Sequence, residues 1–96
     1  MSFLAELEQI IQDRYAHPVA GSYTNKLFEK GLARIAQKVG EEGVEVVVAA
    51  ALQDNPHLVS ESADLLYHLL VLLTAKGLTL ADIEAELARR HTPKSD

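Results

Sequence analysis

Acidic side chains recur in two short segments of this 96-residue chain, at spacings that can serve one site. The first segment holds Glu41, Glu42 and Glu45, and the second holds Glu61 and Asp64. Residues three or four apart lie on one face of a helix, so each segment can present its acids in one direction. Carboxylates that converge with few bases around them are the ligands that Mg²⁺ or Mn²⁺ prefers. The four acids that we expect to share a cation are Glu42, Glu45, Glu61 and Asp64.

The first acidic segment is more than a solvated helix face. Glu42 lies between Val39 and Val46 on the apolar stripe of its helix, and Glu45 lies at the edge of that stripe. We therefore expect both to face the interior. Glu41 points further round the helix, toward water. For Glu41 alone, a solvated helix face is the stronger interpretation.

The second acidic segment belongs to a helix that is otherwise apolar on nearly all sides. Glu61, Asp64 and His68 fall within about 60° of arc at 100° per residue, and form one polar stripe. Burying a carboxylate costs several kcal/mol unless a base or a metal compensates. His68 has two possible roles, a hydrogen bond to a ligand carboxylate or a satisfied histidine of the core.

A line of basic residues precedes the acids. Its members recur every four residues and are Lys26, Lys30, Arg34 and Lys38. Residues 22–40 carry these four bases and one acid, Glu29, in a chain whose net charge is −5. Lys38 lies one turn before Glu42, and a metal beside a cationic run suits a polyphosphate. The alternative for Lys38 is an ion pair within its own helix, to Glu42 or Glu41.

These residues must be positioned by helices, because helical spacing runs along the chain and strand alternation is absent. We expect helices over 3–16, 25–53, 56–76 and about 80–90, the second with a kink near Gly31. The expected end signals are Ser22 or Thr24, Asn55 as N-cap with Pro56 behind it, Gly77, and Thr79 with Asp82.

Composition limits the class of protein. Apolar residues make up 48% and charged residues 24% of the chain, which predicts one globular domain over 1–96. The absence of cysteine excludes a disulfide scaffold and a thiol nucleophile. The negative charge disfavours nucleic acid as a partner. The longest apolar stretch, 65–75, is too short for a bilayer, and residues 1–6 lack a signal peptide's basic start. We therefore expect a cytoplasmic protein that binds no membrane.

The third expected helix carries leucines around nearly its whole circumference. A helix that is apolar all round has to be covered on all sides. Three or four short helices of one chain can hardly do that, so we expect a homo-oligomer, most simply a two-fold dimer. The alternative is a central helix in a monomeric bundle.

The acidic segments resemble the EExxE and ExxD signature of the all-α nucleoside triphosphate pyrophosphohydrolases, the MazG-like superfamily. The matching strings are Glu41-Glu42-Gly43-Val44-Glu45 and Glu61-Ser62-Ala63-Asp64. Two further strings, Ser22-Tyr23-Thr24 and Lys38-Val39-Gly40-Glu41-Glu42, narrow the resemblance to the phosphoribosyl-ATP pyrophosphohydrolase family. The resemblance runs over about 4–90, and Gly43 stands where the family motif usually has alanine.

The resemblance implies an all-α bundle of four to five helices that assembles as a homodimer or larger oligomer. It also implies Mg²⁺-dependent hydrolysis of phosphoribosyl-ATP to phosphoribosyl-AMP and pyrophosphate, the second step of histidine biosynthesis. The matching positions make Glu42, Glu45, Glu61 and Asp64 the metal ligands, with Glu41 as the outer acid.

The remaining expected roles concern water and phosphate. An acid of the first segment, Glu41 or Glu45, would orient or deprotonate the attacking water. Lys38, with Lys26 or Lys30, would hold the outgoing pyrophosphate, and Ser22 and Thr24 would bind a phosphate near a helix start. Two alternatives stay open: a house-cleaning (d)NTP pyrophosphatase and a non-catalytic helical dimerisation module. The Ser22-Tyr23-Thr24 string favours phosphoribosyl-ATP over the first of these.

Overall fold

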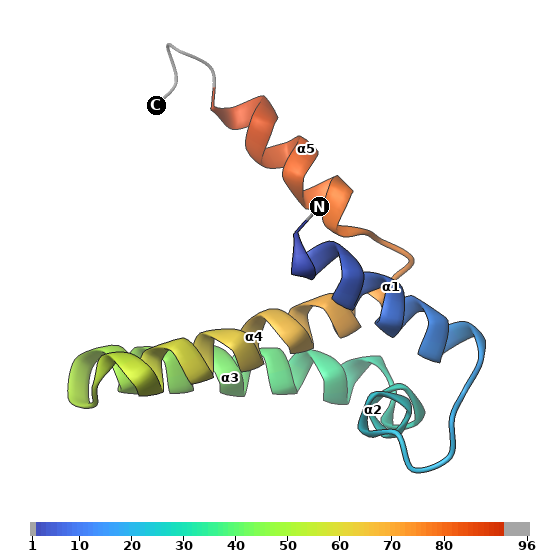
Figure 1. Ribbon diagram of the computed structural model, residues 1–96, viewed down its shortest axis with the longest axis horizontal. Helices are drawn as coiled ribbons and strands as arrows, with labels where there is room; N and C mark the ends of the chain where they lie inside the picture. The colour runs from blue at the N-terminus through green and yellow to red at the C-terminus, as the bar shows by residue number, and fades with distance from the viewer. Residues whose placement is uncertain (1, 92–96) are drawn as a thin grey trace.

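The computed structural model describes residues 2–91, and over that range every regular element is a helix. The five helices are α1 (Phe3–Ala16), α2 (Tyr23–Lys30), α3 (Leu32–Leu52), α4 (Asn55–Ala75) and α5 (Leu80–Arg90), labelled in Figure 1. The expected all-α fold is confirmed. The tail 92–96, which we expect to be loose, lies outside the described residues.

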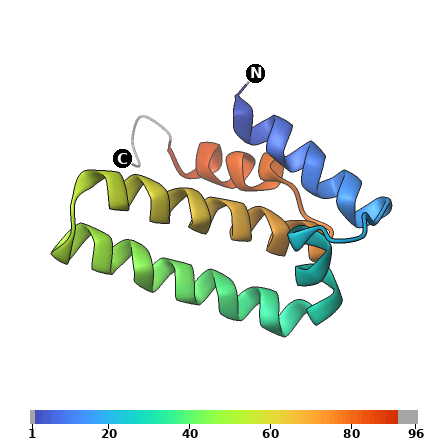
Figure 2. The same cartoon turned by 60° about the horizontal axis from the view of Figure 1, so that its bottom comes forward.

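The two long helices α3 and α4 form an antiparallel hairpin, and their mutual contact is the most extensive in the fold. Both views show them side by side along their whole length (Figures 1 and 2). Helices α1 and α2 pack at the end of the hairpin where α3 begins and α4 ends. Helix α5 projects away from the rest (Figure 1). The acid-bearing segments therefore lie on two directly paired helices.

The expected single helix over 25–53 is wrong, because the chain breaks at Gly31. Helix α2 ends at Lys30 and α3 begins at Leu32, with Gly31 at φ +92° between them. Glycine reaches this backbone region without the strain that a Cβ brings. The break turns α2 across the hairpin and places its N-terminus next to α4.

Side-chain caps set the start of three helices. Ser22 Oγ accepts from the Asn25 backbone amide, as expected for one of the two candidates. The expected cap Asn55 is wrong: the N-cap of α4 is Asp54, whose carboxylate accepts from the His57 amide at 3.0 Å. Asn55 and Pro56 then form the first turn, where a missing N–H costs nothing.

The other expected end signals of the C-terminal half are confirmed. Thr79 and Asp82 make a reciprocal capping box at the start of α5. Gly77 follows α4 at φ +74°, the left-handed conformation expected after a helix end. Helix α4 itself runs one residue earlier at each end than expected, since its N-cap is Asp54 and its C-cap is Lys76.

The core lies where four helices meet. Its buried members are Ile11 of α1, Leu27 of α2, Ile35 of α3, and Leu70 and Val71 of α4. Helix α5 contributes no buried residue. Within residues 2–91, the core therefore anchors the second half of α4, and the first half is paired with α3 alone.

Much apolar surface stays uncovered in the single chain. Among the described residues, α4 is the one helix long and apolar enough to cross a membrane, and 22% of its most apolar stretch is buried. Core helices of globular proteins meet the same criterion. The radius of gyration is 15.0 Å, against about 13 Å for a compact chain of this length. Large apolar side chains of α3 and α4 that remain exposed are Val44, Val47, Leu52, Val59 and Leu66.

Candidate functional site

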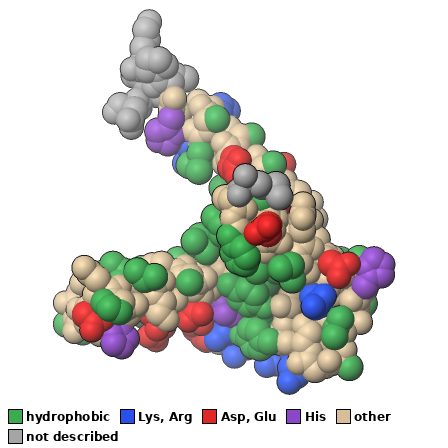
Figure 3. Space-filling model, viewed as in Figure 1, with side chains coloured by type: hydrophobic (Ala, Val, Ile, Leu, Met, Phe, Trp, Pro, Cys, Tyr) green, Lys and Arg blue, Asp and Glu red, His purple; other side chains and the backbone are tan. Residues whose placement is uncertain are grey.

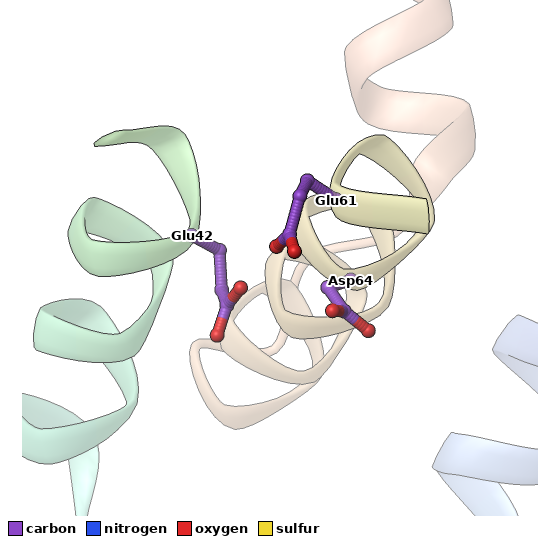
Figure 4. Close-up of side chains that lie close together, drawn as sticks. All are labelled: Glu42, Glu61 and Asp64. Atoms are coloured by element: carbon purple, nitrogen blue, oxygen red, sulfur yellow. The ribbon is translucent and has the colours of Figure 1, made fainter. Parts of the chain in front are cut away.

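Three carboxylates converge in the middle of the α3–α4 hairpin. Oxygens of Glu42, Glu61 and Asp64 all lie within 4.8 Å of one another. Glu42 projects from α3 toward α4, and Glu61 projects from α4 toward α3 (Figure 4). The pairing of the two helices thus brings together three of the four acids expected to share a cation.

Glu45 is the expected ligand that the structure keeps apart from this cluster. Its side chain is exposed, whereas we expect it to face the interior. The reason is that, among the described helices, only α3 and α4 run along this part of the hairpin, so the edge of the apolar stripe is open to solvent. Glu45 still lies near enough to the cluster that its charge is one of the causes that raise the pKa of Glu61.

The cluster carries more negative charge than its surroundings neutralise. Partial desolvation and then the charges of Asp64, Glu45 and Glu42 raise the pKa of Glu61 above its ordinary value. Carboxylate oxygens from two rigid helices, with one ammonium group beside them, form a donor set that fits a hard divalent cation such as Mg²⁺.

Lys38 is the base beside the cluster. Its Nζ lies 3.2 Å from Glu42 and 3.9 Å from Glu41, and the Glu42 side chain is only 12% exposed. The hydrogen bond to Glu42 raises the pKa of Lys38. The ion pair proposed as the alternative for Lys38 is therefore present, and its phosphate role stays a prediction.

Glu41 is held outside the cluster, on the side expected for it. Gln37 donates to its carboxylate at 3.1 Å, and Arg34 lies 3.5 Å away. Its side chain is 46% exposed. Figure 3 shows acidic side chains gathered along the lower edge of the α3–α4 arm, with basic side chains next to them toward α2.

The expected phosphate-binding residues of the α2 start have different surroundings. Ser22 caps the helix, Thr24 shares a hydrogen bond with the Tyr67 hydroxyl, and Lys26 is exposed. Tyr23, between the first two, has its hydroxyl 2.9 Å from His68 Nε2.

Two structural residues near the site are missed by sequence reasoning. Asn25 is buried; its amide donates to the Arg14 carbonyl at 2.7 Å and its side-chain oxygen accepts from the Val19 amide at 2.9 Å. Its position beside the cap is the only sequence signal. Tyr23 contacts His68 across 45 positions of sequence, which no local pattern predicts.

His68 takes one of its two expected roles. It is 5% exposed, its Nδ1 lies 2.7 Å from the Asp64 carbonyl oxygen, and its Nε2 lies 2.9 Å from the Tyr23 hydroxyl. Its partners are a backbone carbonyl and a phenol rather than a ligand carboxylate. His68 is therefore a satisfied core histidine, one turn from an acid of the cluster.

Known proteins resemble this chain over nearly its whole length. A bifunctional histidine biosynthesis protein HisIE of Xanthomonas axonopodis is 56% identical over 93% of this chain and 43% of its own length. A HisIE of Oceanobacillus iheyensis is 48% identical over 98% of this chain and 44% of its own length. A phosphoribosyl-ATP pyrophosphatase of Lacticaseibacillus casei is 53% identical over 93% of this chain and 81% of its own length.

The chain spans less than half the length of the bifunctional relatives and most of the shorter one. The family model for phosphoribosyl-ATP pyrophosphohydrolase matches residues 4–91, which contain all three converging acids and the start of α2. This chain belongs to the phosphoribosyl-ATP pyrophosphohydrolase family.

Proposed function

We propose that this chain hydrolyses phosphoribosyl-ATP to phosphoribosyl-AMP and pyrophosphate with the help of Mg²⁺, as a cytoplasmic enzyme of histidine biosynthesis. Family membership and the names of its relatives support this activity. The observation that carries the proposal is the convergence of three carboxylates within 4.8 Å on two rigid helices. A helical module without catalysis has no need of that arrangement.

Glu42, Glu61 and Asp64 would hold the cation, with Mn²⁺ as a possible substitute, and Glu45 would complete the set from the edge of the cluster. When bound, the cation supplies positive charge that offsets the charge of the phosphates as the α–β anhydride breaks. Rigid helices preorganise the carboxylates, so little rearrangement is needed at the moment of reaction.

The other residues bind phosphate. Lys38 shares its ammonium group between Glu42 and the outgoing pyrophosphate, and Lys26 adds positive charge from α2. The hydroxyls of Ser22 and Thr24 donate to a phosphate oxygen at the α2 start, where the helix dipole also favours an anion. The short distance from Lys38 to Glu42 supports this arrangement, because the base already stands beside the acids.

An acid of α3 orients the attacking water and accepts its proton. Glu45 is the better candidate, since it is exposed beside the cluster, whereas Glu41 is engaged by Arg34, Gln37 and Lys38. Glu45→Gln should therefore lower kcat far more than Glu41→Gln. Equal losses in the two variants would remove this assignment.

The activity is tested by pyrophosphate release from phosphoribosyl-ATP, dCTP and dUTP assayed side by side with Mg²⁺. We expect phosphoribosyl-ATP to have the highest kcat/KM. A preference for a deoxynucleotide would instead support a house-cleaning pyrophosphatase, and no release from any of the three would support a non-catalytic module.

We also propose that a second copy of the chain covers the exposed apolar surface in a two-fold dimer. Val44, Val47 and Val59 are 61–70% exposed, and the radius of gyration of 15.0 Å exceeds that of a compact chain. A self-complementary apolar face of this kind is typical of a homodimer.

Sedimentation analysis tests the dimer. The wild type should sediment as a dimer, and Val47→Glu should shift it toward monomer because a charge enters the apolar contact. Val19→Glu, at an exposed loop position outside the hairpin, is the matched control and should leave the assembly intact. A monomeric wild type would overturn the proposal.

A further inference from the structure

Two adjacent residues of α2 bond to two adjacent residues of α4. The Tyr23 hydroxyl lies 2.9 Å from His68 Nε2, and the Thr24 hydroxyl contacts the Tyr67 hydroxyl. The rings reinforce these bonds: Tyr23 stacks on Tyr67 at 6.2 Å and meets His68 edge-to-face at 5.9 Å. We call these four residues the α2–α4 clamp.

The clamp has a fixed hydrogen-bond direction on the His68 side. The carbonyl oxygen of Asp64 can only accept, so Nδ1 of His68 carries the proton and donates to it at 2.7 Å. In the neutral imidazole, Nε2 is then an acceptor, and the Tyr23 hydroxyl donates to it. The chain of bonds runs from α2 through a buried ring to the backbone of Asp64.

The segment that the clamp holds is short and begins after a loop. Helix α2 has 8 residues and continues into the break at Gly31, whose φ of +92° ends any helical coupling to α3. Leu27 packs in the core and Asn25 bonds to Arg14 and Val19, while the clamp adds a direct tie from the first turn of α2 to the residue that bonds the Asp64 carbonyl.

We propose that Tyr23 and His68 are positioning residues for catalysis. They keep the phosphate-binding start of α2, residues 22–24, in register with the acid cluster, and this inference rests on the proposed function. Alignment of a substrate to within about 1 Å can be worth about a hundredfold in rate, which is the scale on which such a tie matters.

The test uses Tyr23→Phe, which keeps the ring and removes only the hydroxyl. We expect kcat to fall about tenfold or more, while KM changes less than about threefold and the melting temperature stays within a few degrees. Tyr15→Phe is the matched control, because Tyr15 is 54% exposed against 49% for Tyr23 and packs on Phe28 of α2. It should keep wild-type kinetics.

His68→Asn sharpens the test, since asparagine keeps an N–H near the Nδ1 position and removes the acceptor for Tyr23. Its loss in kcat should match that of Tyr23→Phe, and the double variant should lose no more than either alone. Hydrogen exchange adds a readout that needs no turnover: α2 amides should exchange faster in Tyr23→Phe, and α1 amides should not.

Each of the following outcomes bears directly on the positioning role of Tyr23 and His68. A wild-type kcat together with wild-type exchange in Tyr23→Phe would overturn the inference, and so would a raised KM at unchanged kcat, which would mean that Tyr23 contacts the substrate. A wild type that is inactive on phosphoribosyl-ATP would overturn the proposed function and, with it, the catalytic role of the clamp. The exchange rates would still show whether the clamp holds α2.

Discussion

The two halves of α4 differ in burial and in charge. In its second half, Leu70 and Val71 are buried, and the polar ring of His68 finds a partner for each nitrogen. In its first half, Glu61 and Asp64 face Glu42, and their mutual repulsion is left largely uncompensated. One helix therefore carries both the stability of the fold and a site that costs stability until something binds.

The difference arises from what packs on each half. Helices α1 and α2 cover the second half, so apolar groups can leave water there. Of the described helices, the first half has only α3 beside it, which leaves the acids reachable by solvent, ions and small ligands. Binding sites are drawn from such weakly covered, electrostatically strained regions, whereas packed cores are not.

The largest expected effect comes from breaking the acid half. Asp64→Asn keeps the shape of the side chain and removes its charge, so kcat/KM for phosphoribosyl-ATP should fall about a hundredfold or more. The melting temperature without metal should not fall. Asp13→Asn, at an exposed acid of α1, should leave kcat/KM unchanged. Full activity of the Asp64 variant would remove this residue from the proposed ligands.

A substitution in the core half should have the opposite effects, with stability lowered and kcat kept. Leu70→Ala leaves a cavity in the core and should lower the free energy of unfolding by about 2–5 kcal/mol. The folded protein should keep its kcat at low temperature, because Leu70 belongs to the buried core cluster, whose members do not include the three acids. Urea denaturation measures the loss, and Val19→Ala at an exposed position should change stability by about 0.5 kcal/mol or less. An equal loss of stability in Leu70→Ala and Val19→Ala would contradict the assignment of the core to the second half of α4.

Metal should stabilise the acid half. Millimolar Mg²⁺ should raise the melting temperature of the wild type by several degrees, because a ligand of the native state adds to its stability. Asp64→Asn should lose most of that increase. An identical melting curve with and without Mg²⁺ would favour a non-catalytic module.

The smallest expected effect concerns the charge of Glu61. Its pKa in the folded chain is raised above the ordinary value of 4.5, so the folded chain binds this proton more tightly than the unfolded chain. The resulting stability is present below that ordinary value and is lost as pH rises through the raised pKa. Glu61→Gln should therefore raise the metal-free melting temperature slightly at neutral pH.

This gain should shrink as pH falls toward 4.5, where the wild-type carboxyl takes up its own proton. Thermal melts in EDTA across this range measure it, with Glu84→Gln on exposed α5 as the control. A lower melting temperature for Glu61→Gln at neutral pH would show that the acid is stabilised by its neighbours.

Helix periodicity and local caps are predictable because they depend on residues within a turn of one another. The range of α1, the capping box at Thr79 and the left-handed Gly77 all follow from such short-range chemistry. The cap of α4 is misplaced by one residue because Asp54 and Asn55 are both good N-caps, and only their backbone conformations separate them.

The site is predictable only in part. Glu42, Glu61 and Asp64 follow from acids at helical spacing on apolar stripes, and the structure brings them together. The exposed position of Glu45 does not follow, because a stripe has an edge and the sequence does not say how far the covering helix reaches. The partners of Lys38 are likewise a choice between two spacings that the sequence allows equally.

What the sequence determines here is the set of faces: which side of each helix is apolar, where each helix can start, and which acids share a side. Tertiary structure alone decides that Gly31 separates two helices, that Tyr23 reaches His68, and that the acids of α3 and α4 meet in mid-hairpin. The physical reason is range. Propensity, caps and periodicity act between near neighbours along the chain, whereas each of these decisions depends on which surfaces cover one another in space.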